Sequence, residues 1–354
     1  MRNAFAVAIG YCLVLLTMTP LAAQELPPCG IDRSTSLTVP WAGAGDLWCV
    51  ERVVDLPERG PVGLTALAPV GDVLYAVDPI VGELVLVDDT DDDGLPDTTQ
   101  VIADALAYPT ALTAHEDVLY IGGRSTLYRY DMADNALTVL TDGLPGGVTG
   151  YPTGGLYVDG DWLYVGVGGD FDCTEGRGAV WRLSLDGADR ERFADGIAYP
   201  SAITRYDGQL LVADGATDAI YELTAGTDYG ACSGEAPPES VATFEEDAAP
   251  ISMAPNPYGL FPLIEGRLLV ALRGSVGNVI VPGYEVVALD LSGDTPPETV
   301  LPRNSPQLDI ADQRIHIQGS GFYPHHVYGV AVNDRGWVYV SYGNGRVLAM
   351  RPLN

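Results

Sequence analysis

The acidic segment 88–97 carries alternate aspartates that could bind a metal ion. Asp89, Asp91 and Asp93 stand at the first, third and fifth positions of an oxygen-rich calcium loop, followed by a glycine at the sixth. Asp97 stands at the ninth position, whereas the twelfth is a glutamine instead of the usual bidentate glutamate. Clustered carboxylates repel one another unless a cation lies among them, so the segment predicts a structural calcium site. The alternative is a solvated acidic turn.

Two adjacent histidines, His325 and His326, are candidate general bases in a chain that has only four histidines. Lysine chemistry is excluded because all 18 basic residues are arginines. The sequence has no G-x-S-x-G, no H-E-x-x-H and no glycine-rich phosphate loop. Any catalytic group must therefore be assembled from loops that are distant in the sequence.

A sequence pattern recurs six times: a proline, a short apolar strand, a polar turn and a second strand. Its prolines lie 43 to 67 residues apart, close to the ~40–50 residues of a four-stranded propeller blade. Third and fourth strands follow, such as "GELVLVD" and "TTQVIAD". The six copies begin at Gly60, Ala107, Thr149, Ala198, Asn256 and Phe322.

The last copy ends after its third strand, and a ring of blades must close without a free sheet edge. The lone strand "LWCVERVVDLP" (47–57) is of the fourth-strand type, so we expect it to complete the last blade. Helical periodicity is absent after residue 23. The sequence predicts an all-β, six-bladed β-propeller of four-stranded antiparallel blades over 47–354, after an extended lead-in over 24–46. Two packed β-sandwiches are the alternative, which the single continuous period disfavours.

In such a ring the first strands line the central channel, and the residues just before them share one rim. Tyrosines at the rim could equally fill the space between blades. Two further segments lie at the ends of second strands, where the channel begins: Asp214-Gly215-Ala216 and Gly168-Gly169-Asp170. They could place carbonyl and carboxylate groups at the channel, or they could simply be turns, for which these residue types are common. The predicted rim residues are Tyr108, Gly150, Tyr151, Tyr199, Tyr258, Tyr323, His325 and His326.

The first 23 residues have a basic start, an apolar run over 4–16 and the segment "TPLAAQ", which predict a signal peptide cleaved near Ala23. A retained membrane anchor is the alternative, but no later segment has the ~20 apolar residues that span a membrane. We therefore expect a periplasmic or extracellular protein without membrane insertion. Its four remaining cysteines predict disulfides; nearness favours Cys29 with Cys49 and Cys173 with Cys232, among three possible pairings.

The chain is strongly acidic, with 48 Asp and Glu residues and a net charge of -30. Such a charge repels nucleic acid and anionic membranes and attracts cations. Nucleic-acid partners are therefore not expected. The composition says nothing of the oligomeric state.

From about Gly60 to its end the chain resembles the glucose/sorbosone dehydrogenase family. The motifs that carry the resemblance include "DTDDDGLPD", "GLPGGVTGYPTGGLYVDGDWLYVGVGGD", "GIAYPSAITRYDGQLLVADG", "GTDYGACSG" and "GFYPHHVYGVAVNDRGWVYVS". The resemblance implies an exported six-bladed propeller that oxidises a sugar with pyrroloquinoline quinone (PQQ) held by calcium.

The resemblance also implies roles for individual residues. Tyr151 stands where the family has the histidine that takes the proton of the sugar hydroxyl while hydride moves to the quinone. His326 or His325 would then replace that base, with Tyr151 positioning substrate or cofactor.

Four further residues match positions that contact the cofactor in the family. Gly215 and Ala216 match the backbone carbonyls that reach the cofactor's calcium. Asp170 falls at a position that faces the cofactor, and Arg273 falls where the family has a cationic residue or a histidine after the second strand of the fifth copy.

Three functions are thus consistent with the sequence. The first is oxidation of an aldose or a sorbosone-like sugar with PQQ and calcium. The second is a non-catalytic, calcium-stabilised propeller that binds a glycan or a protein through its aromatic rim. The third is a metal-dependent lactonase, for which an obvious inward set of Glu and Asn ligands is lacking.

Overall fold

A computed structural model describes most of the chain beyond residue 47, and the statements below concern the described residues. They are 37–38, 48–90, 96, 98–145, 153–169, 173, 176–261, 264–274, 283–292, 297–301, 307–310, 313–316 and 326–352. The expected signal peptide and almost all of the expected lead-in lie outside these ranges, so both stay predictions.

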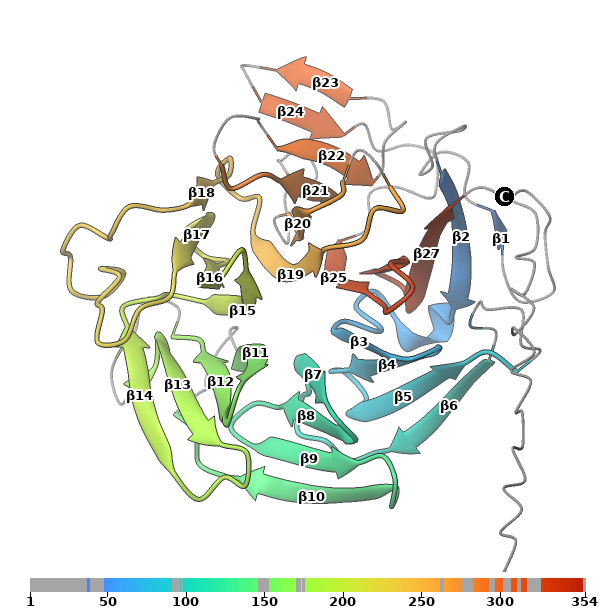
Figure 1. Cartoon of the computed structure of the whole chain (residues 1–354), viewed down its shortest axis with the longest axis horizontal. Helices are drawn as coiled ribbons and strands as arrows, with labels where there is room; N and C mark the ends of the chain where they lie inside the picture. The colour runs from blue at the N-terminus through green and yellow to red at the C-terminus, as the bar shows by residue number, and fades with distance from the viewer. Residues whose placement is uncertain are drawn as a thin grey trace, which may run out of the picture.

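Six antiparallel sheets stand in a ring around one axis (Figure 1). Five of them have four strands in sequential order, and the sixth combines three C-terminal strands with strands from the N-terminal part of the chain. The predicted six-bladed propeller is therefore confirmed, and the alternative of two packed sandwiches is wrong. We number the sheets as blades 1 to 6 in chain order. Blade 1 has β3 (Leu67–Val70), β4 (Val73–Asp78), β5 (Glu83–Asp88) and β6 (Thr98–Ala103); blade 2 has β7 (Ala111–His115), β8 (Val118–Gly122), β9 (Leu127–Asp131) and β10 (Ala136–Thr141).

The next three blades have the same order, with the innermost strand first. Blade 3 has β11 (Thr153–Asp159), β12 (Trp162–Val167), β13 (Ala179–Ser184) and β14 (Arg190–Asp195). Blade 4 has β15 (Pro200–Tyr206), β16 (Gln209–Asp214), β17 (Ala219–Glu222) and β18 (Ala242–Thr243). Blade 5 has β19 (Pro250–Asn256), β20 (Arg267–Leu272), β21 (Glu285–Leu289) and β22 (Glu298–Leu301), followed by a separate hairpin of β23 (Gln307–Ile310) and β24 (Gln313–His316).

Blade 6 joins the two ends of the propeller. It contains β25 (Val327–Val332), β26 (Val338–Tyr342) and β27 (Arg346–Pro352), and its fourth strand is β2 (Trp48–Asp55), to which β1 (Leu37–Thr38) adds. β2 pairs antiparallel with β27 from Trp48 opposite Pro352 to Asp55 opposite Arg346. The expected closure by an N-terminal strand is thus confirmed.

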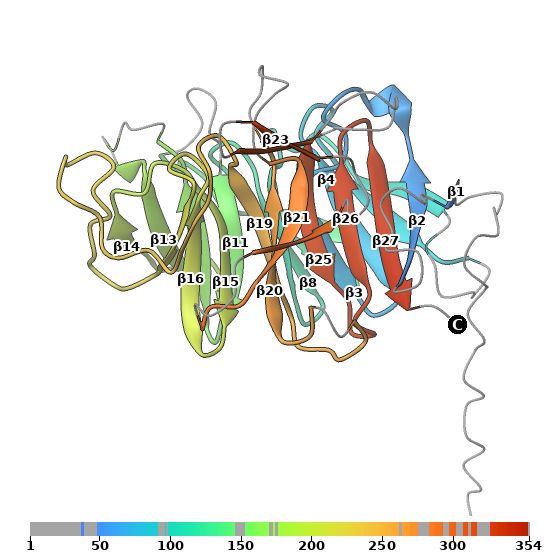
Figure 2. The same cartoon turned by 90° about the horizontal axis from the view of Figure 1, so that it is seen from above.

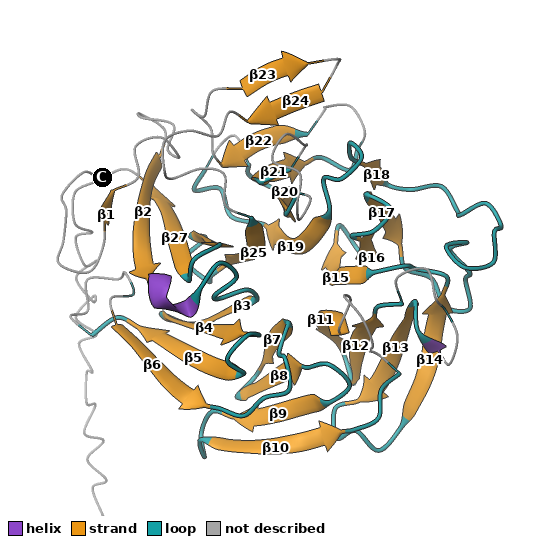
Figure 3. Ribbon diagram, turned by 180° about the vertical axis from the view of Figure 1, so that it is seen from behind, coloured by secondary structure: helices purple, strands orange, loops and turns teal. Residues whose placement is uncertain are grey.

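Helix is nearly absent from the described residues, which include the 3-10 turn Pro57–Arg59 and a further 3-10 position at Gly176; Figure 3 shows only such short helical pieces. Among these residues we find no apolar helix of a length that would cross a membrane. Seen edge-on, the ring is a disc whose strands run between its two faces (Figure 2).

In each blade a small residue is followed by a large apolar residue in, or at the start of, the innermost strand. The six pairs lie at the same level of the ring. The large residue of every pair lies opposite an interior residue of the second strand, for example Leu112 opposite Ile121, the fourth residue of β8, and Met253 opposite Val270, the fourth residue of β20. This small–large step recurs in all six blades. The pairs are Ala66-Leu67, Ala111-Leu112, Gly155-Leu156, Ala202-Ile203, Ser252-Met253 and Gly329-Val330.

The large residues pack into six hydrophobic cores, one between each pair of adjacent blades. Leu112 belongs to the core of blades 1 and 2, and Val330 to the core of blades 5 and 6. The other four do the same at their own interfaces. Every blade therefore inserts one apolar side chain toward the preceding blade, which distributes the hydrophobic stabilisation evenly around the ring.

Near the axis, adjacent inner strands approach closely enough for small side chains to bridge them. The Ser201 hydroxyl donates to the Pro250 carbonyl at 2.6 Å, and the Thr110 hydroxyl donates to the Thr153 carbonyl at 2.6 Å. Between blades 3 and 4 there is no space for a side chain, since a Cβ on Gly154 would lie 2.1 Å from the Pro200 carbonyl oxygen. A glycine or a small residue is required at such contacts.

The fifth repeat was expected to begin at Asn256, with its inner strand after that residue, and this position was wrong. Pro257 follows the inner strand β19, whereas Pro250 begins it. Tyr258 therefore lies in the turn between β19 and β20, where a Cβ on Gly336 would meet its side chain at 2.7 Å. It belongs to the end of the ring opposite to the one where Pro250 enters, and it is not a rim residue of the predicted site.

A buried ion pair links the first and last strands of the ring. The Arg351 guanidinium on β27 donates to both carboxylate oxygens of Glu51 on β2, at 3.2 and 3.3 Å, and both side chains are essentially inaccessible to solvent. The Nη1 of Arg351 has no hydrogen-bond partner within the described residues. The charge of Arg351 thus depends on Glu51 for its compensation.

We expect Glu51→Gln to lower the free energy of unfolding by about 3–5 kcal/mol, because it leaves the buried guanidinium without a carboxylate. Urea unfolding followed by tryptophan fluorescence measures the effect. The matched control is Glu191→Gln, which removes an exposed carboxylate paired with Arg182 and should change the free energy by less than ~1 kcal/mol. Equal effects of the two substitutions would contradict the assignment.

Candidate functional site

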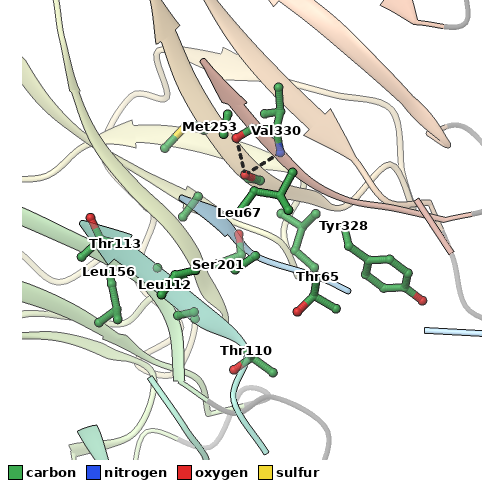
Figure 4. Close-up of a pocket in the computed structure, with 18 of the residues that line it drawn as sticks. Thr65, Leu67, Thr110, Leu112, Thr113, Leu156, Ser201, Met253, Tyr328 and Val330 are labelled. Carbon is green, nitrogen blue, oxygen red and sulfur yellow. Dashed lines mark hydrogen bonds between the residues drawn. The ribbon is translucent and has the colours of Figure 1, made fainter. Parts of the chain in front are cut away.

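An axial cavity of about 570 Å³ is lined by the inner strands of all six blades. Its wall includes the six large residues of the small–large pairs, so a ring of apolar side chains surrounds the axis. Figure 4 shows five of them, Leu67, Leu112, Leu156, Met253 and Val330, arranged around the same space. A ligand in this cavity would contact an apolar wall contributed equally by every blade.

Hydroxyl groups form the other part of the lining. Some are already used between blades: the Ser252 hydroxyl donates to the Val330 carbonyl at 3.3 Å and accepts from the Val330 amide at 3.1 Å (Figure 4). Thr65 and Thr113 also face the cavity. Within the described residues no carboxylate lines this space. Such a lining suits a neutral ligand that carries hydroxyl and apolar groups.

Arg273 is the only ionised side chain among the described residues that line the cavity. It follows β20 directly and lies at the end of the cavity that we call the mouth, which Tyr108, Tyr199 and Tyr328 also line. Its Nε is buried without a hydrogen-bond partner in the described part of the chain. A buried N–H of a cation without an acceptor is costly, so this group favours an anionic ligand.

His326 lies directly against this arginine. Its Nδ1 is 3.0 Å from the Arg273 carbonyl oxygen, and its ring stacks on Tyr284 with a centroid distance of 4.9 Å. Burial lowers the pKa of His326; the hydrogen bond to the Arg273 carbonyl opposes this shift, and the positive charge of the Arg273 side chain adds to it. The imidazole is therefore neutral near pH 7, with Nδ1–H assigned as the donor to the carbonyl and Nε2 left as the basic nitrogen.

Tyr328 separates His326 from the cavity. Tyr328 lines the cavity whereas His326 does not, and their ring centroids are 5.9 Å apart. On another part of the mouth, the guanidinium of Arg124 lies 5.3 Å from the ring centroid of Tyr108. The mouth thus combines aromatic faces with two cations on a protein of net charge -30.

Gly215 and Ala216 lie where the sequence predicts, at the mouth end of blade 4. Hydrogen bonds of their amides hold both residues: the Gly215 amide donates to the Tyr199 carbonyl at 2.9 Å, and the Ala216 amide donates to the Asp214 side-chain carboxylate at 3.1 Å. The buried Asp214 carboxylate also accepts the amides of Ala198 and Tyr199, both at 2.9 Å. It organises the rim and is not available as a ligand; contact of Gly215 and Ala216 with a cofactor stays a prediction.

Several predicted site residues lie outside the described residues. They are Tyr151, His325 and Asp170 at the expected cofactor site, and Asp91, Asp93 and Asp97 in the acidic segment. Asp89 is described and follows the last residue of β5. Since Asp78 at the mouth end of β4 lies opposite Glu83 at the start of β5, Asp89 lies at the far end of the ring. Among the described residues no cluster of His, Cys, Asp and Glu could hold a metal.

One predicted disulfide is confirmed. Cys173 and Cys232 are bonded, with their Cα atoms 5.8 Å apart, and they join the loop after β12 in blade 3 to the loop before β18 in blade 4. Cys49 is disulfide-bonded as well, and its expected partner Cys29 lies outside the described residues. The first bridge connects loops of two neighbouring blades.

Sequence reasoning missed three contributors to the site. Thr65 and Thr113 line the cavity. Each is adjacent in the sequence to the small–large pair of its repeat, and this position could have identified them. Tyr284 stacks on His326. It begins "YEVVALDL", the expected third strand of the fifth repeat, which was not assigned to the site. Only the fold brings blades 5 and 6 together there.

Comparisons with known proteins extend to the fold alone. No family model matches the sequence, and no curated protein matches it. Among solved structures, the PQQ-bound form of an aldose sugar dehydrogenase from Streptomyces coelicolor has 15% identity and a TM-score of 0.60, over 85% of this chain and 97% of that one. A structure described as glucose dehydrogenase has 14% identity and a TM-score of 0.64, over 86% and 99% of the two chains. A streptogramin B lyase has 12% identity and a TM-score of 0.54, over 87% and 98%.

We expect the pKa of His326 to lie below its ordinary value of 6.5, because burial and the charge of the Arg273 side chain outweigh the hydrogen bond to the Arg273 carbonyl. Because the pKa of His326 is lower in the folded protein than in the unfolded chain, protonation of His326 favours unfolding. The free energy of unfolding is therefore not reduced by this group above pH 6.5, and it falls as the pH drops through the pKa of the folded protein. NMR titration of the histidine signals, with His326→Gln for assignment, measures the midpoint. Arg273→Gln should move it upward; a midpoint at or above 6.5 in the unsubstituted protein would contradict the expectation.

Proposed function

We propose that this protein is an exported sugar oxidoreductase that binds an aldose or a sorbosone-like sugar at the mouth of its axial cavity and oxidises it with PQQ. The observation that carries the proposal is the unpartnered, buried Nε of Arg273 beside a neutral histidine. Similarity in fold to sugar dehydrogenases, one of them with PQQ bound, supports it. Export rests on the signal peptide expected over 1–23 and on the disulfides.

The described mouth residues fit the charge and shape of PQQ, a planar tricarboxylate. Arg273 offers a guanidinium without a carboxylate partner in the described residues, and Arg124 adds a second cation on Tyr108. Tyr328 and Tyr108 present aromatic faces to the same space. When bound, PQQ supplies the acceptor for a hydride removed from the sugar carbon. Arg273 would bind one of its carboxylates.

The chain's own residues would supply the proton acceptor and the substrate contacts. His326, neutral at pH 7, accepts the proton of the sugar hydroxyl at Nε2, while its Nδ1–H stays on the Arg273 carbonyl. Reaching the sugar requires Tyr328 to turn aside or a water molecule to relay the proton, since Tyr328 separates the two. Tyr151 and His325 would complete the rim near the substrate.

Calcium would act at two separate places. At the mouth, the carbonyls of Gly215 and Ala216 together with Asp170 would hold the ion that the cofactor needs. At the far end, Asp89, Asp91, Asp93 and Asp97 would hold a structural ion that stiffens the β5–β6 connection. The first calcium ion would take part in cofactor binding, and the second would stabilise the fold.

A binding protein without catalysis is the second candidate function. The position of His326 behind Tyr328 favours it, because a base that does not face the cavity contributes little to chemistry. The hydroxyl and apolar lining would then bind a glycan directly. The lactonase alternative needs inward carboxylates, which the described lining does not provide, and we do not carry it further.

We expect the purified protein to bind PQQ in the presence of calcium and to reduce an artificial electron acceptor with at least one aldose. Arg273→Gln should weaken PQQ binding about tenfold or more, since a charged hydrogen bond contributes ~1.5–3 kcal/mol. Binding is followed by the absorbance of the quinone and turnover by the colour of the acceptor. His326→Ala should abolish the turnover.

Arg129→Gln is the matched control, because Arg129 pairs with Asp131 on β9 outside the cavity and its loss changes the net charge equally. It should leave PQQ binding unchanged. Sugar binding without any PQQ binding or turnover would support the second candidate instead, and equal losses in both arginine variants would refute a specific role of Arg273.

The acidic segment generates a separate prediction about stability. Calcium should raise the melting temperature of the protein, and Asp91→Ala together with Asp93→Ala should abolish that rise, because the remaining carboxylates no longer form the loop. Differential scanning calorimetry with calcium and with a chelator measures it. An unchanged rise in the double variant would show that the segment is only a solvated turn.

A further inference from the structure

The segment that leads into blade 5 is held by a carboxylate of blade 4. Asp218, in the turn between β16 and β17, accepts the Ala249 amide at 2.7 Å and the Asp247 amide at 3.0 Å, one on each oxygen. The main chain adds a third contact, since the Asp218 carbonyl accepts the Phe244 amide at 2.8 Å. One residue of blade 4 thus fixes the approach to β19.

This segment has a conformation that its sequence does not favour. Asp247 and Ala249 have φ values of 72° and 52°, in the left-handed region that residues other than glycine rarely adopt, and Asp218 itself has a φ of 55°. Such backbone persists only where surrounding contacts hold it, and it concentrates at functional sites. Here the holding contacts come from the two oxygens of Asp218.

The same segment holds the backbone of Arg273. The Ala249 carbonyl accepts the Arg273 amide at 3.0 Å, and the Ala248 carbonyl accepts the Gly274 amide at 2.9 Å. These bonds set the position from which the Arg273 side chain extends to the cavity wall. The Arg273 carbonyl in turn receives the Nδ1 of His326 at 3.0 Å.

We infer that Asp218 is a positioning residue for the proposed site: through the Asp247–Ala249 turn it places both the Arg273 guanidinium and the His326 imidazole. The chain of contacts crosses three blades, from Asp218 in blade 4 through Arg273 in blade 5 to His326 in blade 6. The inference rests on the proposed function for its consequence on binding, but the contacts themselves do not depend on it.

Position, and not merely stability, is what Asp218 controls in this arrangement. Asp214, four residues earlier, holds the rim tyrosine of its own blade in the same way, and the hydrogen bonds of its carboxylate within the described residues go to Ala198, Tyr199 and Ala216 of blade 4. Removal of the Asp218 carboxylate would release the left-handed turn and allow the Arg273 backbone to move. The Arg273 guanidinium and the His326 imidazole would then no longer be held in their present positions relative to each other.

The test compares Asp218→Ala and Asp218→Asn with the unsubstituted protein, without ligand and with PQQ as the probe. NMR signals of His326 report its environment directly, and they can be assigned because the chain has only four histidines. We expect Asp218→Ala to shift the His326 signals and to weaken PQQ binding by roughly tenfold or more. Asp218→Asn, which keeps one acceptor oxygen, should show smaller changes of both kinds.

Asp131→Asn is the control, because Asp131 accepts the Asp134 amide at 3.2 Å in the turn after β9, away from the mouth. It should leave the His326 signals and PQQ binding unchanged. A folded Asp218→Ala protein with unaltered His326 signals overturns the inference. If Asp218→Ala does not fold, Asp218→Asn decides: unaltered His326 signals in that variant overturn the inference too.

The two readouts separate the inference from the proposed function. Absence of PQQ binding in the unsubstituted protein refutes the cofactor, while a shift of the His326 signals in the Asp218 variants still supports the positioning role. PQQ binding that is equally tight in all variants supports the cofactor and overturns the positioning role.

Discussion

The close approach of six inner strands around one axis is the constraint on which the rest of this structure depends. Each strand meets its neighbour at a small residue, and between blades 3 and 4 even a Cβ on Gly154 would overlap the Pro200 carbonyl. The adjoining large residue then fills the core toward the preceding blade. Because every interface repeats this step, the ring closes only if the last blade is complete, which the pairing of β2 with β27 ensures. The buried Glu51–Arg351 pair holds that closure from within.

The same geometry creates the cavity and sets its chemistry. The inner strands present apolar and hydroxyl side chains toward the axis, and the described lining has one charge, that of Arg273. In a protein of net charge -30, an arginine with a buried, unpartnered Nε stands out as the group that attracts an anion. The pKa of His326 is lowered chiefly by burial and also by the charge of the Arg273 side chain, against the opposing effect of the hydrogen bond to the Arg273 carbonyl. Recognition of an anion and the availability of a base thus arise from one contact.

Buried aspartates organise the loops at the mouth. Asp78 accepts the amides of Ile80 and Val81, Asp214 accepts those of Ala198 and Tyr199, and Asp218 accepts those of Asp247 and Ala249. In each case a carboxylate at the end of a second strand, or in the turn after it, satisfies amides that would otherwise lack a partner. This use explains part of the acidic composition without any ligand. Of these three aspartates, only Asp218 accepts amides of the segment that leads into the next blade.

The sequence by itself determined the number of blades, their strand order and the closing strand, because each follows from a repeated local pattern or from a requirement of closure. It favoured the Cys173–Cys232 disulfide only by nearness, among three possible pairings, and the structure decided that pairing. It also identified Arg273 and His326 as candidates, from residue type and resemblance. Tertiary structure alone decided that these two residues touch, that Tyr284 stacks on the imidazole and that Tyr258 lies at the wrong end. The reason is physical: repeats are encoded by near neighbours along the chain, whereas the mouth is made of loops from different blades. Their mutual positions depend on the ring as a whole.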